Sequence, residues 1–206
     1  MNAHPEKASP RLVTYDVTDC DTHVVHPHLN SVHKSGTSTK MSVSSNKITP
    51  CLWFNGQAEE AANLYTSLFK NSRVTKVTRH TEPGQEIHGQ PASQVLVVAF
   101  ELGGQPFIAL NGGPQFKFNE AVSFQIDCAD QDEVDYFWTN LSKGGDESKR
   151  QCGWLADRFG VAWQIVPKAL TKMLDDPDVE KVKRVMVSMM AMKKLDIAGL
   201  QKAYDG

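Results

Sequence analysis

The pattern of apolar and polar positions divides this chain of 206 residues into a polar segment and a strongly patterned remainder. Residues 1–46 are rich in Ser, Thr, His, Asp and Pro and show no apolar periodicity. Such a segment buries too little surface to offset the entropy lost on ordering, so we predict a disordered N-terminal tail. Met41 directly precedes the patterned part, and we interpret it as a candidate translation start that would make the upstream residues an over-extended reading frame.

The patterned part opens with alternating residues that predict a strand over 48–54. Asn55 is expected to cap the helix that follows, with Gly56 making the turn. The apolar stripe of that helix consists of Ala58, Ala61, Leu64, Tyr65, Leu68 and Phe69. Three further strands are expected over 73–80, 93–101 and 105–111, with a polar loop over 83–91 and a tight turn at Gly103-Gly104.

The same order of elements returns in the second half of the chain. Alternation over 121–127 predicts a strand, and Asp130 with Glu133 forms the signature of a helix start. Gly144-Gly145 is expected to end this helix, and a hairpin follows over 151–166, where Asp157 and Arg158 shape the turn. The repeat predicts an α+β fold of two tandem β-α-β-β-β modules, over 47–113 and 119–167.

Residues 168–206 change to helical spacing and predict a C-terminal helical extension. Asp176-Pro177 is expected to open one of its helices and Asp196 the last. Its methionine-rich stripe suits either an adaptable partner surface or packing on its own domain.

Composition excludes several classes of protein. The net charge is −2 and the basic residues are scattered, so the sequence shows no basic patch of the kind that binds nucleic acid. No apolar run is long enough to span a membrane, and no secretory signal pattern is seen. Four widely spaced cysteines suit free thiols in the cytoplasm; they are Cys20, Cys51, Cys128 and Cys152.

Several short sequence motifs resemble those of a known family. They include Ile48-Thr49-Pro50-Cys51-Leu52-Trp53-Phe54, Ala109-Leu110-Asn111-Gly112-Gly113-Pro114, Val134-Asp135-Tyr136-Phe137-Trp138, Cys152-Gly153-Trp154-Leu155 and Trp163-Gln164-Ile165-Val166-Pro167. In this order they resemble the vicinal oxygen chelate superfamily of glyoxalase, bleomycin-resistance and extradiol dioxygenase relatives, and within it the PhnB-like branch. The resemblance covers about 47–206. It implies that each module curls into a half-barrel around a cavity, and that the protein forms a homodimer.

Proteins of this branch often bear the name 3-demethylubiquinone-9 3-methyltransferase. The residues do not support methyl transfer, because no strand leads into a Gly-x-Gly loop and helix that would hold an adenosyl cofactor. Gly103-Gly104 and Gly112-Gly113 lie in turn contexts instead.

The resemblance also implies where a metal would sit. Metal-binding members place His or Glu on the first and fourth strands of each module, and the equivalent positions here are Thr49, Ala109, Ala121 and Gln164. None is a histidine or carboxylate, so we expect no catalytic metal and no other cofactor. A divalent-metal enzyme is the alternative. Histidines gather in the N-terminal tail (His23, His26, His28 and His33), where a segment without fixed geometry would bind metal only incidentally.

Alternation then predicts which residues line the cavity. The candidates are Cys51, Trp53, Asn111, Phe116, Phe118, Ser123, Gln125 and Gln164. Aromatic surface with neutral amides and a hydroxyl suits a neutral or weakly polar small molecule. In the alternative interpretation the serine and both glutamines satisfy one another as a buried network. Phe116 and Phe118 would either cover the pocket or pack between the modules, and Cys51 is either a nucleophile or a buried thiol.

These residues favour a metal-free small-molecule-binding protein. An enzyme of the same fold and a methyltransferase remain as alternatives, and the residues name no substrate.

Overall fold

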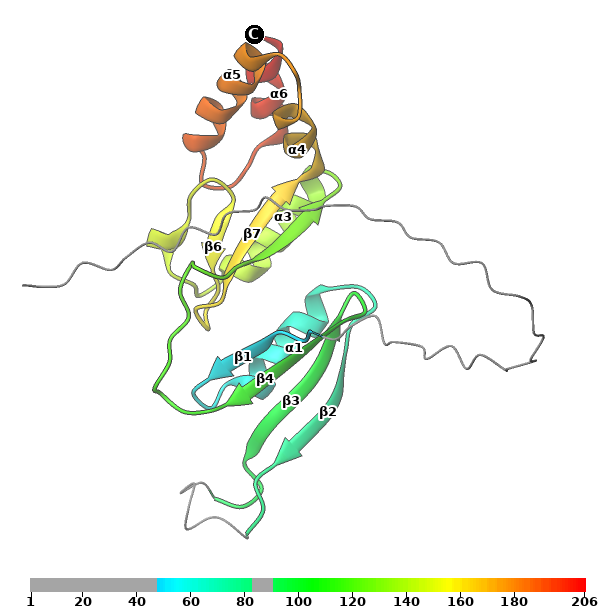
Figure 1. Cartoon of the computed structure of the whole chain (residues 1–206), viewed down its shortest axis with the longest axis vertical. Coiled ribbons are helices and arrows are strands. Elements are labelled where there is room, and N and C mark those ends of the chain that lie inside the picture. Colours follow the sequence, from blue (N-terminus) through cyan, green and yellow to red (C-terminus); the bar gives the residue numbers. More distant parts are fainter. Residues whose placement is uncertain (1–47, 83–90) are drawn as a thin grey trace, which may run out of the picture. The chain divides into compact units, whose positions relative to one another are not determined.

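The computed structural model describes residues 48–82 and 91–206 (Figure 1). The predicted tail over 1–46, its histidines and most of the expected loop over 83–91 lie outside the described residues. The described elements are β1 (Cys51–Phe54), α1 (Ala58–Leu68), β2 (Arg73–Arg79), β3 (Val95–Leu102), β4 (Gln105–Asn111), β5 (Phe124–Cys128), α3 (Gln131–Ser142), the short 3-10 helix η1 (Glu147–Lys149), β6 (Trp154–Ala156), β7 (Ala162–Pro167), α4 (Lys168–Leu174), α5 (Val179–Met190) and α6 (Ile197–Asp205).

The first module forms a four-stranded sheet in the order β1-β4-β3-β2. Its first strand pairs in parallel with its last, while the pairs β2–β3 and β3–β4 are antiparallel. Gly103 and Gly104 join β3 to β4 with φ angles of 56° and 85°, a backbone that glycine adopts without strain. The tight turn predicted at these two glycines is therefore confirmed.

The second module repeats this plan with one strand fewer. Its sheet has the order β5-β7-β6, and its first strand again pairs in parallel with its last. Where β2 follows α1 in the first module, the described chain after α3 contains only η1 before the β6–β7 hairpin. The second sheet is therefore narrower than the first.

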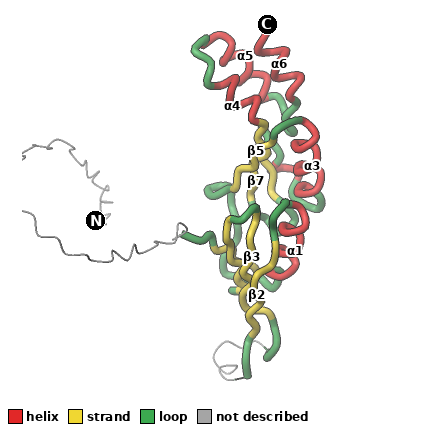
Figure 2. Tube along the Cα trace, turned by 90° about the vertical axis from the view of Figure 1, so that its right-hand side faces the viewer, coloured by secondary structure: helices red, strands yellow, loops and turns green. Residues whose placement is uncertain are grey.

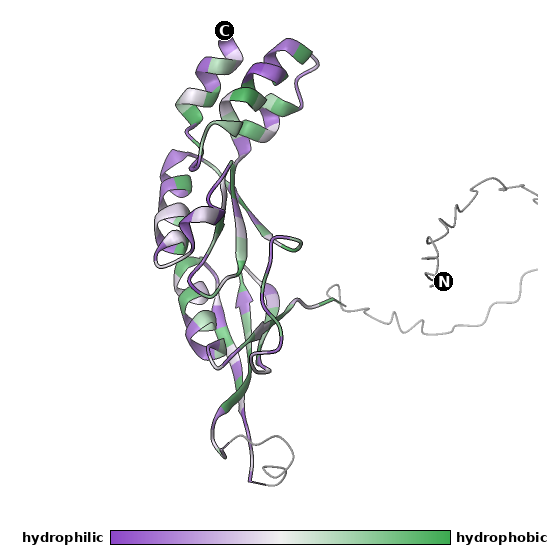
Figure 3. Cartoon of the chain, turned by 90° about the vertical axis from the view of Figure 1, so that its left-hand side faces the viewer, coloured by the Kyte–Doolittle hydropathy of each residue, from purple (hydrophilic) through white to green (hydrophobic). Residues whose placement is uncertain are grey.

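Helices α1 and α3 lie on the same side of the two sheets (Figures 2 and 3). Each helix buries its apolar stripe against strands, and one apolar cluster joins residues of both modules. Aromatic rings form much of this junction: Tyr65 and Phe69 of the first module contact Trp163 of the second, and Phe107 contacts Phe124. The two modules therefore share one core.

The helix starts test the predicted caps. The N-cap of α1 is Gln57, which makes no side-chain cap, so the prediction for Asn55 was wrong. The amide oxygen of Asn111 accepts from the Ala58 N–H at 2.9 Å instead, a cap from a distant strand. In α3 the prediction is confirmed, since Asp130 accepts from Glu133 N–H and Glu133 in turn accepts from Ala129 N–H.

The C-terminal helices α4 to α6 pack around a second apolar cluster, which includes Leu170, Val185 and Leu200. Asp196 caps α6 as predicted. The N-cap of α5 is Asp178, whose carboxylate accepts from two backbone N–H groups, so the cap predicted at Asp176-Pro177 was wrong. Asp176 instead accepts from Asp178 N–H and from the Tyr204 hydroxyl. No helix in the described part of the chain is long and apolar enough to cross a membrane.

Candidate functional site

The face of each sheet that lies away from α1 and α3, here called the open face, carries several of the predicted site residues. On the first sheet, Cys51 is exposed and Trp53 half-buried. The parallel register places them beside Ile108 and Leu110 of β4. Alternation then puts Leu52 and Phe54, both buried, on the helix-covered face.

The register corrects one predicted face. Asn111 was expected beside Trp53 on the open face, but it pairs with Phe54, and Ala109 pairs with Leu52. Both β4 residues therefore lie on the helix-covered face. The error arose because one residue of slip in a strand exchanges its two faces, and the turn at Gly103-Gly104 alone does not fix the register.

On the second sheet, the open face is polar at its centre. Gln125 and Gln164 are direct neighbours across the parallel pair β5–β7. The Gln164 amide donates to the Ser123 hydroxyl at 2.8 Å, and the Gln125 amide donates to Asp127 at 2.8 Å. Within the described residues no hydrogen bond is accepted by the side-chain oxygen of either glutamine. The side-chain oxygens of these two neighbouring residues are therefore available as neutral acceptors.

A pocket of about 420 Å³ lies over these glutamines. We call it the helix-roofed pocket. Its floor comes from the second sheet and the residues beside it: Gln125, Cys152, Trp154, Gln164 and Val166. Its roof comes from the C-terminal helices and the segments next to them: Leu170, Thr171, Leu174, Asp175, Met189 and Leu195. The β6–β7 register pairs Trp154 directly with Gln164, so an indole ring adjoins the amides.

The three aromatic candidates lie together at the end of β1, in a separate pocket of about 350 Å³. Phe116 is 65% exposed and meets the Trp53 ring edge-to-face at 4.9 Å between centroids. Phe118 instead contacts Phe54 and the shared core. A Cβ on Gly112 would come within 2.2 Å of the Trp53 ring, whose Nε1 donates to Gly113. The missing side chain at Gly112 therefore leaves room for this indole, and the bond to the Gly113 carbonyl fixes its position.

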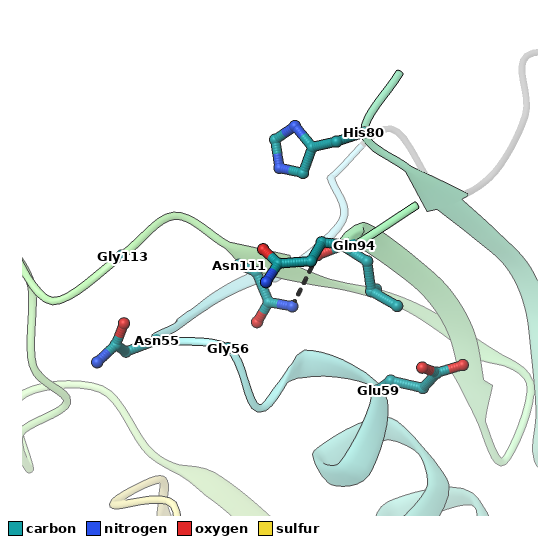
Figure 4. Close-up of a pocket in the computed structure, with 8 residues that line it drawn as sticks. Asn55, Gly56, Glu59, His80, Gln94, Asn111 and Gly113 are labelled. Carbon is teal, nitrogen blue, oxygen red and sulfur yellow. Dashed lines mark hydrogen bonds between the residues drawn. The ribbon is translucent and has the colours of Figure 1, made fainter. Parts of the chain in front are cut away.

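Asn111 lies in a third, more polar pocket of about 380 Å³, which Figure 4 shows. Its amide nitrogen donates to the Val95 carbonyl at 2.9 Å, and its oxygen caps α1. His80, Gln94 and Glu59 surround it in the same view. Since both ends of the Asn111 amide are occupied, this residue holds α1 and β3 together.

Among the residues that the structure describes, Asp157 is the most deeply buried acidic or basic side chain, at 2% exposure. Its carboxylate accepts from Tyr65 and Trp163 side chains and from two backbone N–H groups. Burial raises the pKa of Asp157, and the four donors partly offset this rise. Burial, followed by the Asp157 charge, raises the pKa of Tyr65 well above its ordinary range. The turn-shaping role predicted for Asp157 is present, because two of these donors belong to the turn.

The sequence pattern of the 3-demethylubiquinone-9 3-methyltransferase family matches residues 46–166. The chain belongs to this family. Among solved structures, a PhnB protein of Bacillus cereus described as a 3-demethylubiquinone-9 3-methyltransferase shares 33% identity at a TM-score of 0.51; the alignment covers 59% of this chain and 98% of that chain. Protein PA1353 of Pseudomonas aeruginosa shares 21% identity at a TM-score of 0.41, over 58% of this chain and 96% of that chain. None of the curated proteins matches. The PhnB-like resemblance and the expected glyoxalase-like fold are confirmed.

A catalytic metal of the superfamily does not fit the residues of this PhnB-like chain. The β4 position expected for a metal ligand was Ala109, which lies on the helix-covered face. On the open face, the β4 residue beside Trp53 is Leu110. The four relevant residues are then Thr49, Leu110, Ala121 and Gln164, and none is a histidine or carboxylate. Within residues 48–82 and 91–206, no group of three or more His, Cys, Asp or Glu side chains could hold a metal ion.

The cysteines also differ among themselves. Cys51 is exposed on the open face, whereas burial raises the pKa of the Cys128 thiol to about 12, with nearby carboxylates adding to the rise. Cys128 is therefore a protonated core residue.

Trp154 was missed as a pocket residue, although alternation through the hairpin pairs it with Gln164. The roof residues carried no signal, since their position depends on how the C-terminal helices dock.

Proposed function

We propose that this chain binds an uncharged small molecule in the helix-roofed pocket. One observation carries this proposal: Gln125 and Gln164 present adjacent neutral acceptors beside Trp154, within a pocket of about 420 Å³. A flat apolar body can stack on the indole while an N–H or O–H group donates to the amide oxygens. Of the residues predicted from the sequence, Gln125 and Gln164 line this pocket and Ser123 orients the second.

The charge of the lining supports a neutral ligand. No lysine, arginine or histidine lines the pocket among the described residues, and the charges at it are carboxylates: Asp175 lines it, and Asp127 accepts from the Gln125 amide at 2.8 Å. An anion would therefore enter without a counterion and would lose its hydration. We expect cinnamamide to bind and cinnamate, of nearly the same shape, to bind at least about tenfold more weakly.

Native mass spectrometry of the full chain, purified without a histidine tag, tests the proposal. A small organic adduct without metal is expected. Calorimetry with cinnamamide follows, comparing the wild type with Gln164→Leu, which removes the acceptor and keeps the volume. Loss of binding in the variant supports the pocket. A stoichiometric divalent ion that EDTA removes would make the metalloenzyme alternative correct, and equal binding by both proteins would rule out this site.

We propose further that the chain forms a homodimer through the open face of its first sheet. This face places Trp53, Val97, Ile108 and Leu110 together, all partly exposed, which is more apolar surface than a solvated sheet face usually carries. Light scattering after size-exclusion chromatography should give a dimer mass for the wild type and a monomer mass for Leu110→Lys. Lys76→Glu, on the exposed β2 strand, is the control that should remain dimeric. A monomeric wild type would contradict the proposal.

Methyl transfer, which the family name indicates, receives no support from the described residues. The glycine pairs stand at the β3–β4 turn and after β4, where they allow a turn and the approach of Trp53. Neither pair joins a strand to a helix N-terminus, the arrangement that would hold an adenosyl cofactor. We therefore expect no adenosylmethionine binding by calorimetry.

A further inference from the structure

We propose that the C-terminal helices select the ligand, with Thr171, Leu174 and Met189 as specificity-determining residues. This inference rests on the proposed function, since it concerns the roof of the same pocket. It adds that the floor alone does not define the ligand, and that the apolar surface of the C-terminal helices decides how large a molecule is accepted.

The roof lies outside the part of the chain that the family pattern matches. The family match ends at residue 166, one residue before the end of β7, and α4 starts at Lys168. The Bacillus cereus relative is covered over 98% of its length by 59% of this chain. The floor glutamines therefore lie within the matched region, while the roof is formed by residues that follow it.

The roof is held in a fixed position over the floor. The backbone N–H groups of Cys152 and Gly153 donate to the carbonyls of Met192 and Lys193, both at 2.8 Å. Gln131 of α3 donates to the Leu195 carbonyl at 3.2 Å, and its own side-chain oxygen accepts from Ile197 N–H at 2.9 Å. The link between α5 and α6 is thus tied to the second module at two places. A roof attached in this way presents its side chains before any ligand arrives, which favours affinity.

The chemistry of the roof complements that of the floor. Leu174 and Met189 are half-buried aliphatic side chains that also pack in the C-terminal apolar cluster, and Thr171 is an exposed hydroxyl on α4. The floor offers two amide oxygens and an indole. A molecule that fills both parts has a donor group at one end and a flat apolar body enclosed between Trp154 and Met189. We therefore assign the ligand to the class of uncharged aryl or alkenyl amides, amines and phenols.

Two methionines of the same helix provide a matched test. Met189 lines the pocket, whereas Met186, on the same helix, is 40% exposed and does not line it. Calorimetry of cinnamamide binding to the full chain compares wild type, Met189→Ala, Met186→Ala and Gln164→Leu. Met189→Ala should weaken binding about tenfold through lost apolar contact, while Met186→Ala should leave it unchanged.

A second measurement avoids any change in the fold. In NMR spectra of the wild type with ¹³C-labelled methionine methyl groups, cinnamamide should shift the Met189 methyl signal and leave the Met186 signal in place. The two alanine variants assign these signals. Weak binding by Gln164→Leu with no effect of Met189→Ala and no methyl shift would overturn the roof's role and leave the proposed function standing. If Gln164→Leu also binds normally, or the wild type binds no cinnamamide, both proposals fail.

Discussion

The hydroxyl of Tyr65 donates a hydrogen bond of 2.7 Å to Oδ2 of Asp157, and this bond joins residues 92 positions apart. Tyr65 lies on α1 of the first module, and Asp157 lies in the β6–β7 turn of the second. Trp163 donates to the same oxygen at 2.9 Å, so both partners share one acceptor inside the common core. This buried carboxylate therefore links α1 of the first module to the β6–β7 turn of the second, within the core that the two modules share.

Removal of the Tyr65 hydroxyl should destabilise the protein while leaving the ring in place. We expect Tyr65→Phe to lower the free energy of unfolding by about 2 kcal/mol, because a buried bond to a charged group is lost. Urea unfolding measures this change. The control is Tyr136→Phe, whose hydroxyl makes an exposed bond of 3.3 Å to the Leu68 carbonyl and should cost under about 1 kcal/mol. Equal effects of the two variants would contradict the role of Asp157.

Asp157→Asn should be more damaging than Tyr65→Phe. Four donors converge on the carboxylate, and an amide NH2 group in place of one oxygen would face another donor without an acceptor. We expect a loss of about 3 kcal/mol near neutral pH. Asp146→Asn is a suitable control, since this aspartate is exposed and caps only η1. Unfolding midpoints within error of the wild type for Asp157→Asn would show that the network is dispensable.

The pH dependence of stability should carry the signature of the same group. Burial raises the folded-state pKa of Asp157 above its ordinary value of 3.8, so the folded state holds this proton more tightly than the unfolded chain does. The stability gained from protonation is complete below about 3.8 and is lost as the pH rises through the folded-state pKa. The stability difference between wild type and Asp157→Asn should therefore shrink as the pH rises from about 4 through the raised folded-state pKa. A difference that grows with pH would refute the assignment.

Gly112→Ala tests how Trp53 is held on the open face. The new methyl group would lie 2.2 Å from Cζ2 of the ring, so the indole must move and its bond to the Gly113 carbonyl must break. We expect a loss of about 2 kcal/mol by urea unfolding. In a Trp53→Leu background the same substitution should cost markedly less, because the contact no longer exists. Additive effects of the two changes would show that the ring and the glycine are independent.

Much of this fold could be predicted because local signals agreed with one another. Alternation located the strands, and Asp130 with Glu133 fixed the start of α3, since both act within a few residues. The prediction for Asn55 was wrong because Asn111, distant in sequence, supplies the cap that local reasoning gave to the nearest polar residue. Competition between local and distant partners leaves no trace in the sequence around a helix start.

The candidate site was accessible only in part for the same reason. Gln125 and Gln164 were found because a period of two predicts the face of a strand once one residue on it is placed. Asn111 was assigned to the wrong face because strand pairing, which the sequence does not specify, sets the register of β4. The roof residues were missed because the docking of α4 and α5 depends on contacts such as Gln131 with Ile197, which connect distant segments.

Gln131 makes the attachment of the C-terminal helices open to experiment. Its side chain contacts Asp135, the Leu195 carbonyl and Ile197 N–H, so Gln131→Ala should release the start of α6. Hydrogen exchange followed by mass spectrometry should show about tenfold faster exchange over 195–200 with little change in β7. Gln201→Ala removes only an exposed bond to Asp205 within α6 and serves as the control. Unchanged exchange in Gln131→Ala would show that Gln131 is dispensable and that the backbone bonds of Cys152 and Gly153, together with apolar packing, hold the roof.

Gln164→Glu examines whether this position belongs to a hidden metal site. Glutamate is a divalent-ion ligand in this fold family, and residue 164 lies on the open face beside Gln125 and Trp154, neither of which binds metal as a charged ligand. We therefore expect metal content after dialysis against manganese, measured by plasma mass spectrometry, to equal that of the wild type. Stability should change by less than about 1 kcal/mol, since the residue is only half-buried. Gln164→Leu, which offers no oxygen, is the matched control. One tightly held ion per chain in Gln164→Glu alone would mean that ligands from elsewhere reach this position, and that the pocket evolved from a metal site whose other members are still in place.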